Sequence, residues 1–329
     1  MSATETETGR EGGALASLRR MKRPAWLGPL VALLVVYAIF AIITPEHSFL
    51  RSQIFLTMAR QSVVLTICAL GMTLVIVTGG IDLSTGSLVA LTTVVLAKML
   101  KGGSSPAVAV ACAVGVSTAV GAFVGVCVGR FRLMPFVVTL GTMAVLRGSA
   151  IGIANEQKID CDARGLDHIL EASLSAPGLW ITLSLAAVVS LVLGYTRFGR
   201  HVFAVGSNEA AARLCGIDAG RVKIAVYAIS SLLVGVAGVM EFSTLTVGDP
   251  TDSVGLELDV IAAVVIGGAP LAGGEGSVLG SVFGALLIIV IRTGAVHMGM
   301  PSWVQYIVTG VIIFVAVAVD SARRKAHRT

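Results

Sequence analysis

Charged residues are scarce in this 329-residue sequence: Asp, Glu, Lys and Arg make up 13% of it, against 55% hydrophobic residues. Soluble domains contain about one-quarter charged residues, because their surfaces must be polar, so a soluble fold is excluded. The apolar runs are continuous rather than alternating, which excludes a transmembrane β-barrel. The predicted fold class is an all-α polytopic membrane protein.

Enzyme motifs are also missing. The sequence contains no G-x-x-x-x-G-K-[ST] phosphate-binding loop and no H-E-x-x-H metal motif. No serine and histidine are placed together as a nucleophile and its base. The five cysteines show no C-x-x-C spacing, and the basic residues come with no nucleic-acid-binding module. We therefore expect no catalytic residue, metal site or cofactor in this chain, and no nucleic-acid partner.

Long apolar segments fill most of the chain. A helix needs about 20 apolar residues to span the hydrocarbon core of a bilayer. The eighth segment has only 11 residues, which is typical of a re-entrant or broken helix, so eight or nine full crossings remain an alternative. The ten predicted transmembrane or partly spanning helices are 25–43, 56–78, 86–100, 106–128, 134–154, 178–195, 222–246, 258–268, 277–292 and 302–319.

The basic residues predict the orientation. With the N-terminus inside, 16 of the 24 lysines and arginines fall in inside segments and six in outside loops. Cytoplasmic loops are enriched in basic residues, so both termini are predicted to be cytoplasmic. This divides the chain into a disordered cytoplasmic N-tail (1–24), a transmembrane domain (25–320) with a large cytoplasmic loop (196–223), and a basic cytoplasmic C-tail (321–329).

A glycine pair interrupts an apolar stretch at Gly79 and Gly80. Glycine ends a helix at little cost, and Asp82 or Ser84 can cap the helix that follows. One interpretation is a helix break that shapes a path for a polar solute. The alternatives are a plain loop at the membrane surface and a proton-relay role for Asp82.

A second segment resembles the first. The stretch "VVIGGAPLAGGEGS" (264–277) shares its Gly-Gly, Leu and Gly-Ser pattern with "VIVTGGIDLSTGS" (75–87), and its glycine pair is Gly267 and Gly268. Paired glycine-interrupted segments are typical of transport paths. The alternative is chance similarity in a chain with 38 glycines.

The stretch "VGSNEAAARLCGID" (205–218) predicts a short helix inside the basic cytoplasmic loop. Ser207 or Asn208 can cap its start, and Gly216 suits its end. Its apolar face is Leu214 and several alanines, too little for stable anchoring on a membrane. We therefore expect it to dock on a partner protein.

The stretch "LMPFVVTLGTMAVLRG" (133–148) has a face of small and hydroxyl residues. Such a face lets membrane helices approach closely, so packing is the expected role of Thr139, Gly141 and Thr142. Contact of Thr139 or Thr142 with a solute is the alternative. Arg147 is expected to extend along its apolar neighbours toward the outer interface.

Several long stretches together resemble the permease subunits of bacterial ABC importers for ribose and related monosaccharides. They are "GMTLVIVTGGIDLSTGSLVAL" (71–91), "PFVVTLGTMAVLRG" (135–148), "RFGRHVFAVGSNEAAARLCGID" (197–218), "ELDVIAAVVIGGAPLAGGEGSVLGSVFGALL" (257–287) and "WVQYIVTGVIIFVAVAVD" (303–320). The resemblance implies a multi-pass pore subunit in the bacterial cytoplasmic (inner) membrane. Its implied partners are a second permease copy or a paralogue, cytoplasmic subunits that bind ATP and Mg, an extracytoplasmic sugar-binding protein and the lipid bilayer.

The resemblance also implies site residues. Glu209-Ala210-Ala211, four residues and then Gly216 resemble the sugar-importer form of the signature by which ABC permeases couple to their ATPases. A stand-alone secondary transporter is the alternative function, although the buried ionisable groups that it would need are scarce. The expected coupling helix comprises Ser207, Asn208, Glu209, Ala210, Ala211, Arg213 and Gly216. The expected translocation path or helix breaks comprise Gly79, Gly80, Asp82, Ser84, Thr139, Thr142, Gly267 and Gly268.

Overall fold

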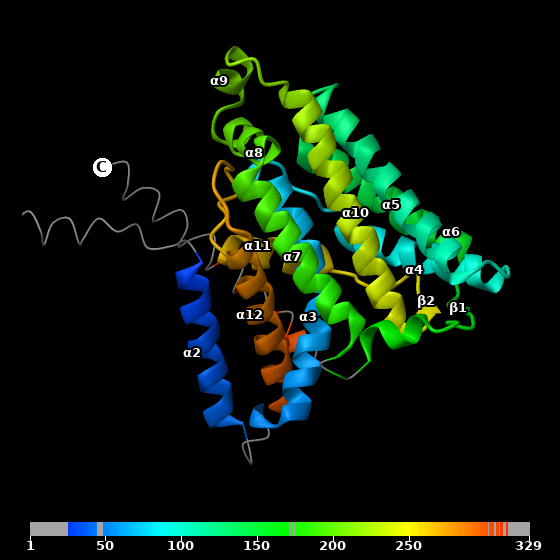
Figure 1. Ribbon diagram of the computed structural model, residues 1–329. Helices are drawn as coiled ribbons and strands as arrows, with labels where there is room; N and C mark the ends of the chain where they lie inside the picture. Colours follow the sequence, from blue (N-terminus) through cyan, green and yellow to red (C-terminus); the bar gives the residue numbers. More distant parts are fainter. Residues whose placement is uncertain are drawn as a thin grey trace, which may run out of the picture.

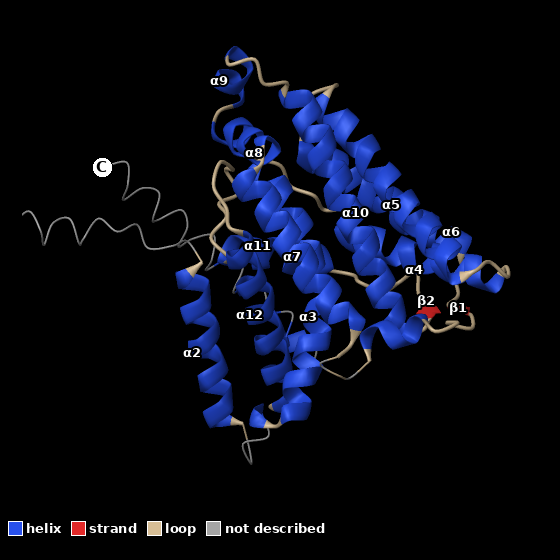
Figure 2. Ribbon diagram, viewed as in Figure 1, coloured by secondary structure: helices blue, strands red, loops and turns tan. Residues whose placement is uncertain are grey.

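The computed structural model is nearly all helical (Figures 1 and 2). It describes residues 26–44, 49–171, 173, 175–301, 303–305, 307, 308, 310, 311 and 314. The predicted N-tail (1–24) and C-tail (321–329), and part of the predicted span 302–319, lie outside the described residues.

Six helices in the described part are long and apolar enough to cross a membrane: α3, α5, α6, α7, α10 and α12. The helices α2 and α4 are apolar but have only 17 residues each. The helices are α2 (Leu27–Ile43), α3 (Ser52–Val77), α4 (Thr85–Lys101), α5 (Pro106–Gly129), α6 (Pro135–Ile153), η2 (Leu166–Leu170), α7 (Pro177–Tyr195), α8 (Arg197–Ser207), α9 (Glu209–Leu214), α10 (Ala219–Leu245), α11 (Leu256–Ile266) and α12 (Val278–His297).

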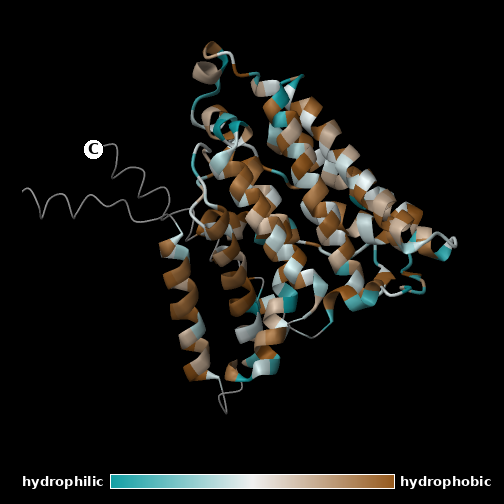
Figure 3. Cartoon of the chain, in the orientation of Figure 1, coloured by the Kyte–Doolittle hydropathy of each residue, from teal (hydrophilic) through white to brown (hydrophobic). Residues whose placement is uncertain are grey.

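The core sits around α3 and α4. In α3, 89% of the apolar window is buried, against 17–28% in α5, α6 and α7, which expose long apolar surfaces. Apolar residues cover the sides of the bundle, whereas polar residues gather at the α8–α9 end and around the β-strands (Figure 3). This distribution is that of a membrane protein whose outer helices face lipid.

Three glycines of α5, each four residues apart, bring this helix against α10; they are Gly121, Gly125 and Gly129. A Cβ atom at Gly121 would lie 2.3 Å from the Ser231 hydroxyl, and one at Gly125 would lie 2.7 Å from the Ile224 Cα. Small residues at this spacing let two membrane helices touch along their backbones. The Ser117 hydroxyl adds a hydrogen bond to the Ser231 carbonyl (2.5 Å).

The helix α11 is as short as its apolar run predicts. Its 11 residues cover about 16 Å at 1.5 Å per residue, well short of a hydrocarbon core of about 30 Å. It packs on α12 through glycines: a Cβ atom at Gly284 would lie 2.0 Å from the Ala263 carbonyl oxygen. The helix α11 is thus a partly spanning segment held against a full-length helix.

The fold is nearly all helical, as predicted, and one minimal sheet accompanies the helices. The strand β1 (Ile159–Asp160) pairs antiparallel with β2 (Val247–Gly248), so the fold contains a minimal sheet. The strands join two connections that are distant in the sequence. A ladder of two residues leaves no alternating pattern in the sequence from which it could be predicted. The charge count treated Arg292 as one of the six basic residues in outside loops, but Arg292 lies within α12.

Candidate coupling and translocation site

The short helix predicted within residues 205–218 is present as α9. The Asn208 side chain caps it by accepting a hydrogen bond from the Ala211 amide (3.0 Å). Gly216, at φ +81°, follows its end, and the Ile217 amide bonds back to the Ala212 carbonyl. Both the capping residue and the glycine stop are therefore confirmed. The preceding helix α8 was not predicted.

Glu209 ties α9 to the start of α10. Its carboxylate bonds to Arg213 within α9 and to Lys223 on α10, both at 2.7 Å. Partial burial raises the pKa of Glu209, but the hydrogen bonds from Lys223 and Arg213 outweigh it, so the pKa lies below its ordinary value. Glu209 is therefore a structural anchor whose carboxylate is already occupied.

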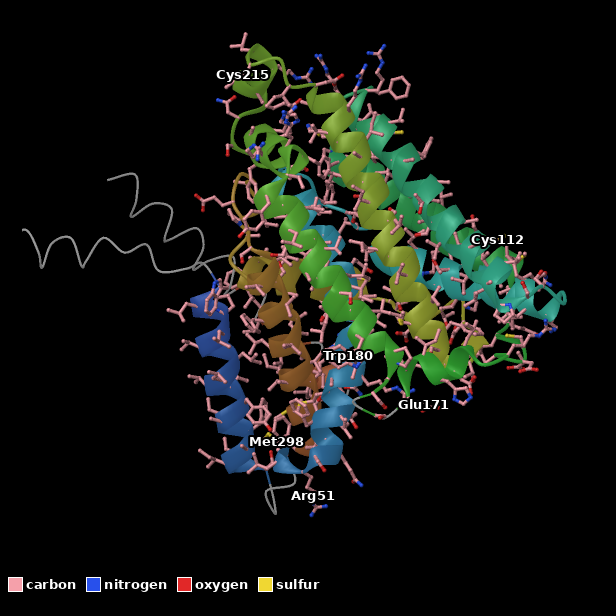
Figure 4. The ribbon with its side chains drawn as sticks, in the orientation of Figure 1. Arg51, Cys112, Glu171, Trp180, Cys215 and Met298 are labelled. Atoms are coloured by element: carbon pink, nitrogen blue, oxygen red, sulfur yellow. The ribbon has the colours of Figure 1, made fainter. Side chains whose placement is uncertain are left out.

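The face of α9 that does not contact α10 is exposed. Ala210, Ala211 and Cys215 are exposed, and Leu214 is 90% exposed. Figure 4 places Cys215 at the extremity of the molecule opposite Arg51. The exposed end of α9 thus presents a small apolar surface, while Glu209 holds the helix against α10.

The first helix break lies between α3 and α4. Gly79 adopts φ +77°, and the Gly80 amide bonds back to the Val75 carbonyl, which closes α3. Asp82 is buried, and its Oδ1 accepts hydrogen bonds from the Ser84 amide (2.9 Å) and hydroxyl (2.6 Å). The prediction that Asp82 or Ser84 caps α4 is wrong, because neither side chain bonds to an amide inside the helix. Asp82 instead holds Ser84 in place.

The second break, between α11 and α12, closes in the same way. Gly268 adopts φ +93°, and the Ala269 amide bonds back to the Val264 carbonyl. The left-handed residue is the second glycine of this pair but the first of the Gly79-Gly80 pair. The structural equivalence is therefore shifted by one residue from the sequence alignment. Ser277 caps α12 by accepting from the Gly280 amide (3.3 Å).

Both breaks meet the α8–α9 junction. The Gly274 amide donates to the Val77 carbonyl (2.9 Å), which joins the second break to the end of α3. The Ser207 hydroxyl donates to the Gly274 carbonyl (3.5 Å). A Cβ atom at Gly273 would lie 2.7 Å from the Gly79 amide nitrogen. Three distant segments are thus packed backbone to backbone at the end of α8.

The two threonines of α6 differ. Thr139 is fully buried. Its hydroxyl lies 2.9 Å from the Pro135 carbonyl oxygen on its own helix and 3.2 Å from the Ile81 carbonyl oxygen in the first break, and can donate to either. Thr142 bonds only to the Val138 carbonyl of its own helix. Of the two, only Thr139 is brought to the break.

A polar cluster forms where α4 and α11 begin. A Cβ atom at Gly86 would lie 2.3 Å from the Glu257 carboxylate, so the two helix starts touch. Arg147 donates to the carbonyls of Pro250 and Asp252, both at 2.8 Å. Arg147 therefore fastens the connection before α11.

An ion pair between a buried carboxylate and a partly exposed arginine joins the same region to α12. Arg292 bonds to Asp259, whose side chain is 2% exposed. Sequence reasoning missed this pair and Glu257, although acids at the start of an apolar run were the available signal. Among the described residues, no cluster of His, Cys, Asp or Glu is arranged to hold a metal ion.

These features are those of a multi-pass membrane protein, and the family that the chain matches is one of transport components. Residues 54–317 match the family described as branched-chain amino acid transport system / permease component, and the chain belongs to that family.

Individual relatives are ABC import permeases. The chain is 39% identical over 315 residues to the ribose import permease protein RbsC of Escherichia coli K12, covering 93% of this chain and 98% of the relative. It is 36% identical to RbsC of Bacillus subtilis (89% and 92% covered) and 34% identical to the fructose import permease protein FrcC of Rhizobium meliloti (90% and 85%). No solved structure matches.

Proposed function

We propose that this chain is the pore subunit of an ATP-driven monosaccharide importer in the bacterial cytoplasmic membrane. Relatives are named for import of ribose and of fructose and for transport of L-arabinose, which supports a sugar as the substrate. A separate cytoplasmic subunit binds ATP and Mg and hydrolyses the ATP. A second permease copy or a paralogue completes the pore.

The orientation follows from the same proposal. Both termini and the tip of α9 face the cytoplasm, where the ATPase docks. The paired connections at β1 and β2 then face outside, where a sugar-binding protein delivers its cargo. The bare face of α9 supports docking, because exposed Leu214 and its small neighbours leave room for a partner to close over them.

One observation carries the coupling mechanism: the α8–α9 junction touches both helix breaks through its backbone. A displacement of α9 by the ATPase therefore acts on Val77 and on Gly274 without an intervening side chain. Backbone contacts of this kind transmit movement because packed interiors have little free volume to absorb it. The ATP cycle would thus reshape the path at Gly79–Ser84 and at Gly267–Gly268.

The proposal predicts a stoichiometric partner. The tagged chain is extracted gently from its native membrane, and the co-purifying subunits and their ATPase activity are measured. Glu209→Lys places a cation against Lys223 and Arg213, so we expect the ATPase to be lost while the permease stays in the membrane. Glu156→Lys, the same charge change at an exposed residue after α6, is the control and should retain the ATPase.

Transport completes the test. Vesicles containing the assembled complex and its binding protein should accumulate a labelled monosaccharide only with ATP, and competition among ribose, fructose and L-arabinose would identify the sugar. A chain that purifies alone and moves solute without ATP would overturn the proposal and favour a secondary transporter.

A further inference from the structure

A cavity of about 430 Å³ lies apart from the helix breaks, between the α5–α6 connection and the start of α10. Its walls are unusual for this chain because half of the lining residues are arginines. The lining residues are Gly129, Arg130, Arg132, Arg213, Asp218, Gly220, Arg221 and Ile224.

Glycine contact between two helices forms the floor of the cavity. A Cβ atom at Gly129 would lie 2.5 Å from the Gly220 carbonyl oxygen, so the end of α5 and the start of α10 touch. The connection after α5 folds back on that helix, because the Phe131 and Leu133 amides bond to the Val126 and Cys127 carbonyls. Both arginines of the connection are thereby held at the cavity wall.

The charge in the cavity is not balanced. Arg221 pairs with Asp218 (3.0 Å), and Arg213 pairs with Glu209. Arg130 and Arg132 have no hydrogen bond or ion pair with their side chains in the described part of the chain. Arginine presents planar, multidentate donors that match phosphate oxygens, so this cavity suits a phosphate-like anion.

An apolar surface adjoins the same arginines. Phe131, between them, is 66% exposed, and Leu133, Met134 and Phe136 are 50–74% exposed. Only 17% of the apolar window of α6 is buried, so this helix presents a lipid-facing side from its first turn. A free anion makes no use of such a flank, whereas acyl chains would cover it.

We propose that this cavity binds the headgroup of an anionic phospholipid of the inner leaflet, with the acyl chains along the start of α6. The proposal uses the cytoplasmic orientation of the α9 end given under the proposed function. A basic pocket between transmembrane helices on the cytoplasmic side is the setting in which acidic headgroups bind. The bound lipid would fix the α5–α6 connection against Arg213, at the base of α9.

The test is lipid retention measured by native mass spectrometry. The purified chain in detergent is titrated with phosphatidylglycerol or with phosphatidylcholine, and bound lipids are counted. We expect phosphatidylglycerol to bind in preference to phosphatidylcholine. Arg130→Gln with Arg132→Gln should weaken phosphatidylglycerol binding by about 30-fold, since each basic residue near an anionic surface contributes about 1 kcal/mol.

The control variant removes the same charge elsewhere on that end of the molecule. Arg197→Gln with Arg200→Gln lies on α8, outside the cavity, and should retain phosphatidylglycerol as the unaltered chain does. A thermal melt of each variant separates loss of lipid from loss of folding. Lipid binding itself is measured without ATPase or sugar, so a failure of the lipid site leaves the importer proposal standing.

Three outcomes would overturn the lipid site. Equal phosphatidylglycerol binding by the folded Arg130/Arg132 variant and its control would remove the arginines from the argument. Displacement of the lipid by millimolar inorganic phosphate would identify a site for a free anion. Unchanged lipid binding with loss of the co-purifying ATPase would assign the cavity to protein docking.

Discussion

Gly206 of α8 lies directly against Val77, the last residue of α3. A Cβ atom at position 206 would be 1.8 Å from the Val77 carbonyl oxygen and 2.7 Å from the Gly274 amide nitrogen, the two atoms that hydrogen-bond to each other. Only glycine fits here, because any other residue would separate α8 from both helix breaks. This contact is where the proposed coupling can be tested most directly.

Gly206→Ala should therefore reduce ATP-dependent uptake at least tenfold. Overpacking a tight contact costs about 1–3 kcal/mol, so a lower Tm should accompany the loss. Gly194→Ala on α7 is the matched control, since a Cβ atom there meets nothing within 4 Å. Wild-type uptake by Gly206→Ala would contradict direct coupling through this contact.

Asp82 should act as a hydrogen-bond acceptor rather than a proton carrier. Asp82→Ala leaves the buried Ser84 amide without a partner, at a cost of about 1–3 kcal/mol, and should lower both Tm and uptake. Asp82→Asn keeps one acceptor oxygen and should retain most activity. Equal and complete loss in both variants, with normal Tm, would support the proton-relay hypothesis instead.

The threonines of α6 provide a matched pair. Thr139→Val removes the donor to the Ile81 carbonyl in the first break, so we expect a loss of about 1 kcal/mol in stability and slower uptake. Thr142→Val removes a bond only within its own helix and should change uptake little. Similar behaviour of the two variants would show that the contact with Ile81 is unimportant.

The Asp259–Arg292 pair should be essential to the placement of α11. Removing Arg292 leaves the buried Asp259 charge without its partner, which costs about 3–5 kcal/mol, whereas the partly exposed Arg292 loses less when Asp259 is removed. Asp259→Asn and Arg292→Met should each lower Tm and the yield of folded protein. The double variant Asp259→Leu with Arg292→Met should recover much of the lost stability, and a purely additive double-mutant cycle would argue against the pair.

The pair formed by Lys158 and Asp249 predicts a pH dependence at the β1–β2 connection. Burial raises the pKa of Asp249, but hydrogen bonds from Lys158 and Thr251 outweigh it, so the pKa lies below its ordinary 3.8. The stabilisation is therefore present above that ordinary value and is lost as the pH falls through the lower folded-state pKa.

Lys158→Gln should consequently lower Tm slightly at neutral pH, and the difference from the unaltered chain should vanish in strong acid. Lys101→Gln is the control, since the Lys101 side chain makes no hydrogen bond or ion pair in the described residues. Thermal melts over a pH series measure both variants. A difference between Lys158→Gln and the unaltered chain that persists at low pH would exclude the ion pair as its source.

The sequence alone determined the class of the protein, the positions of most helices and the short capped helix α9. These follow from local rules: continuous apolar runs form membrane helices, and Asn208 and Gly216 mark the limits of α9 through bonds to their own neighbours. The 11-residue length of α11 could also be predicted, because the apolar run in the sequence has that length.

The tertiary structure decided how these parts meet. Gly206, Val77 and Gly274 are separated by up to about 200 positions, and no local pattern indicates that their backbones touch. The acceptor role of Asp82 and the pairing of Asp259 with Arg292 likewise depend on which group burial places opposite each charge. A buried polar group takes whichever partner the packing brings within reach, and only the assembled helices define that partner.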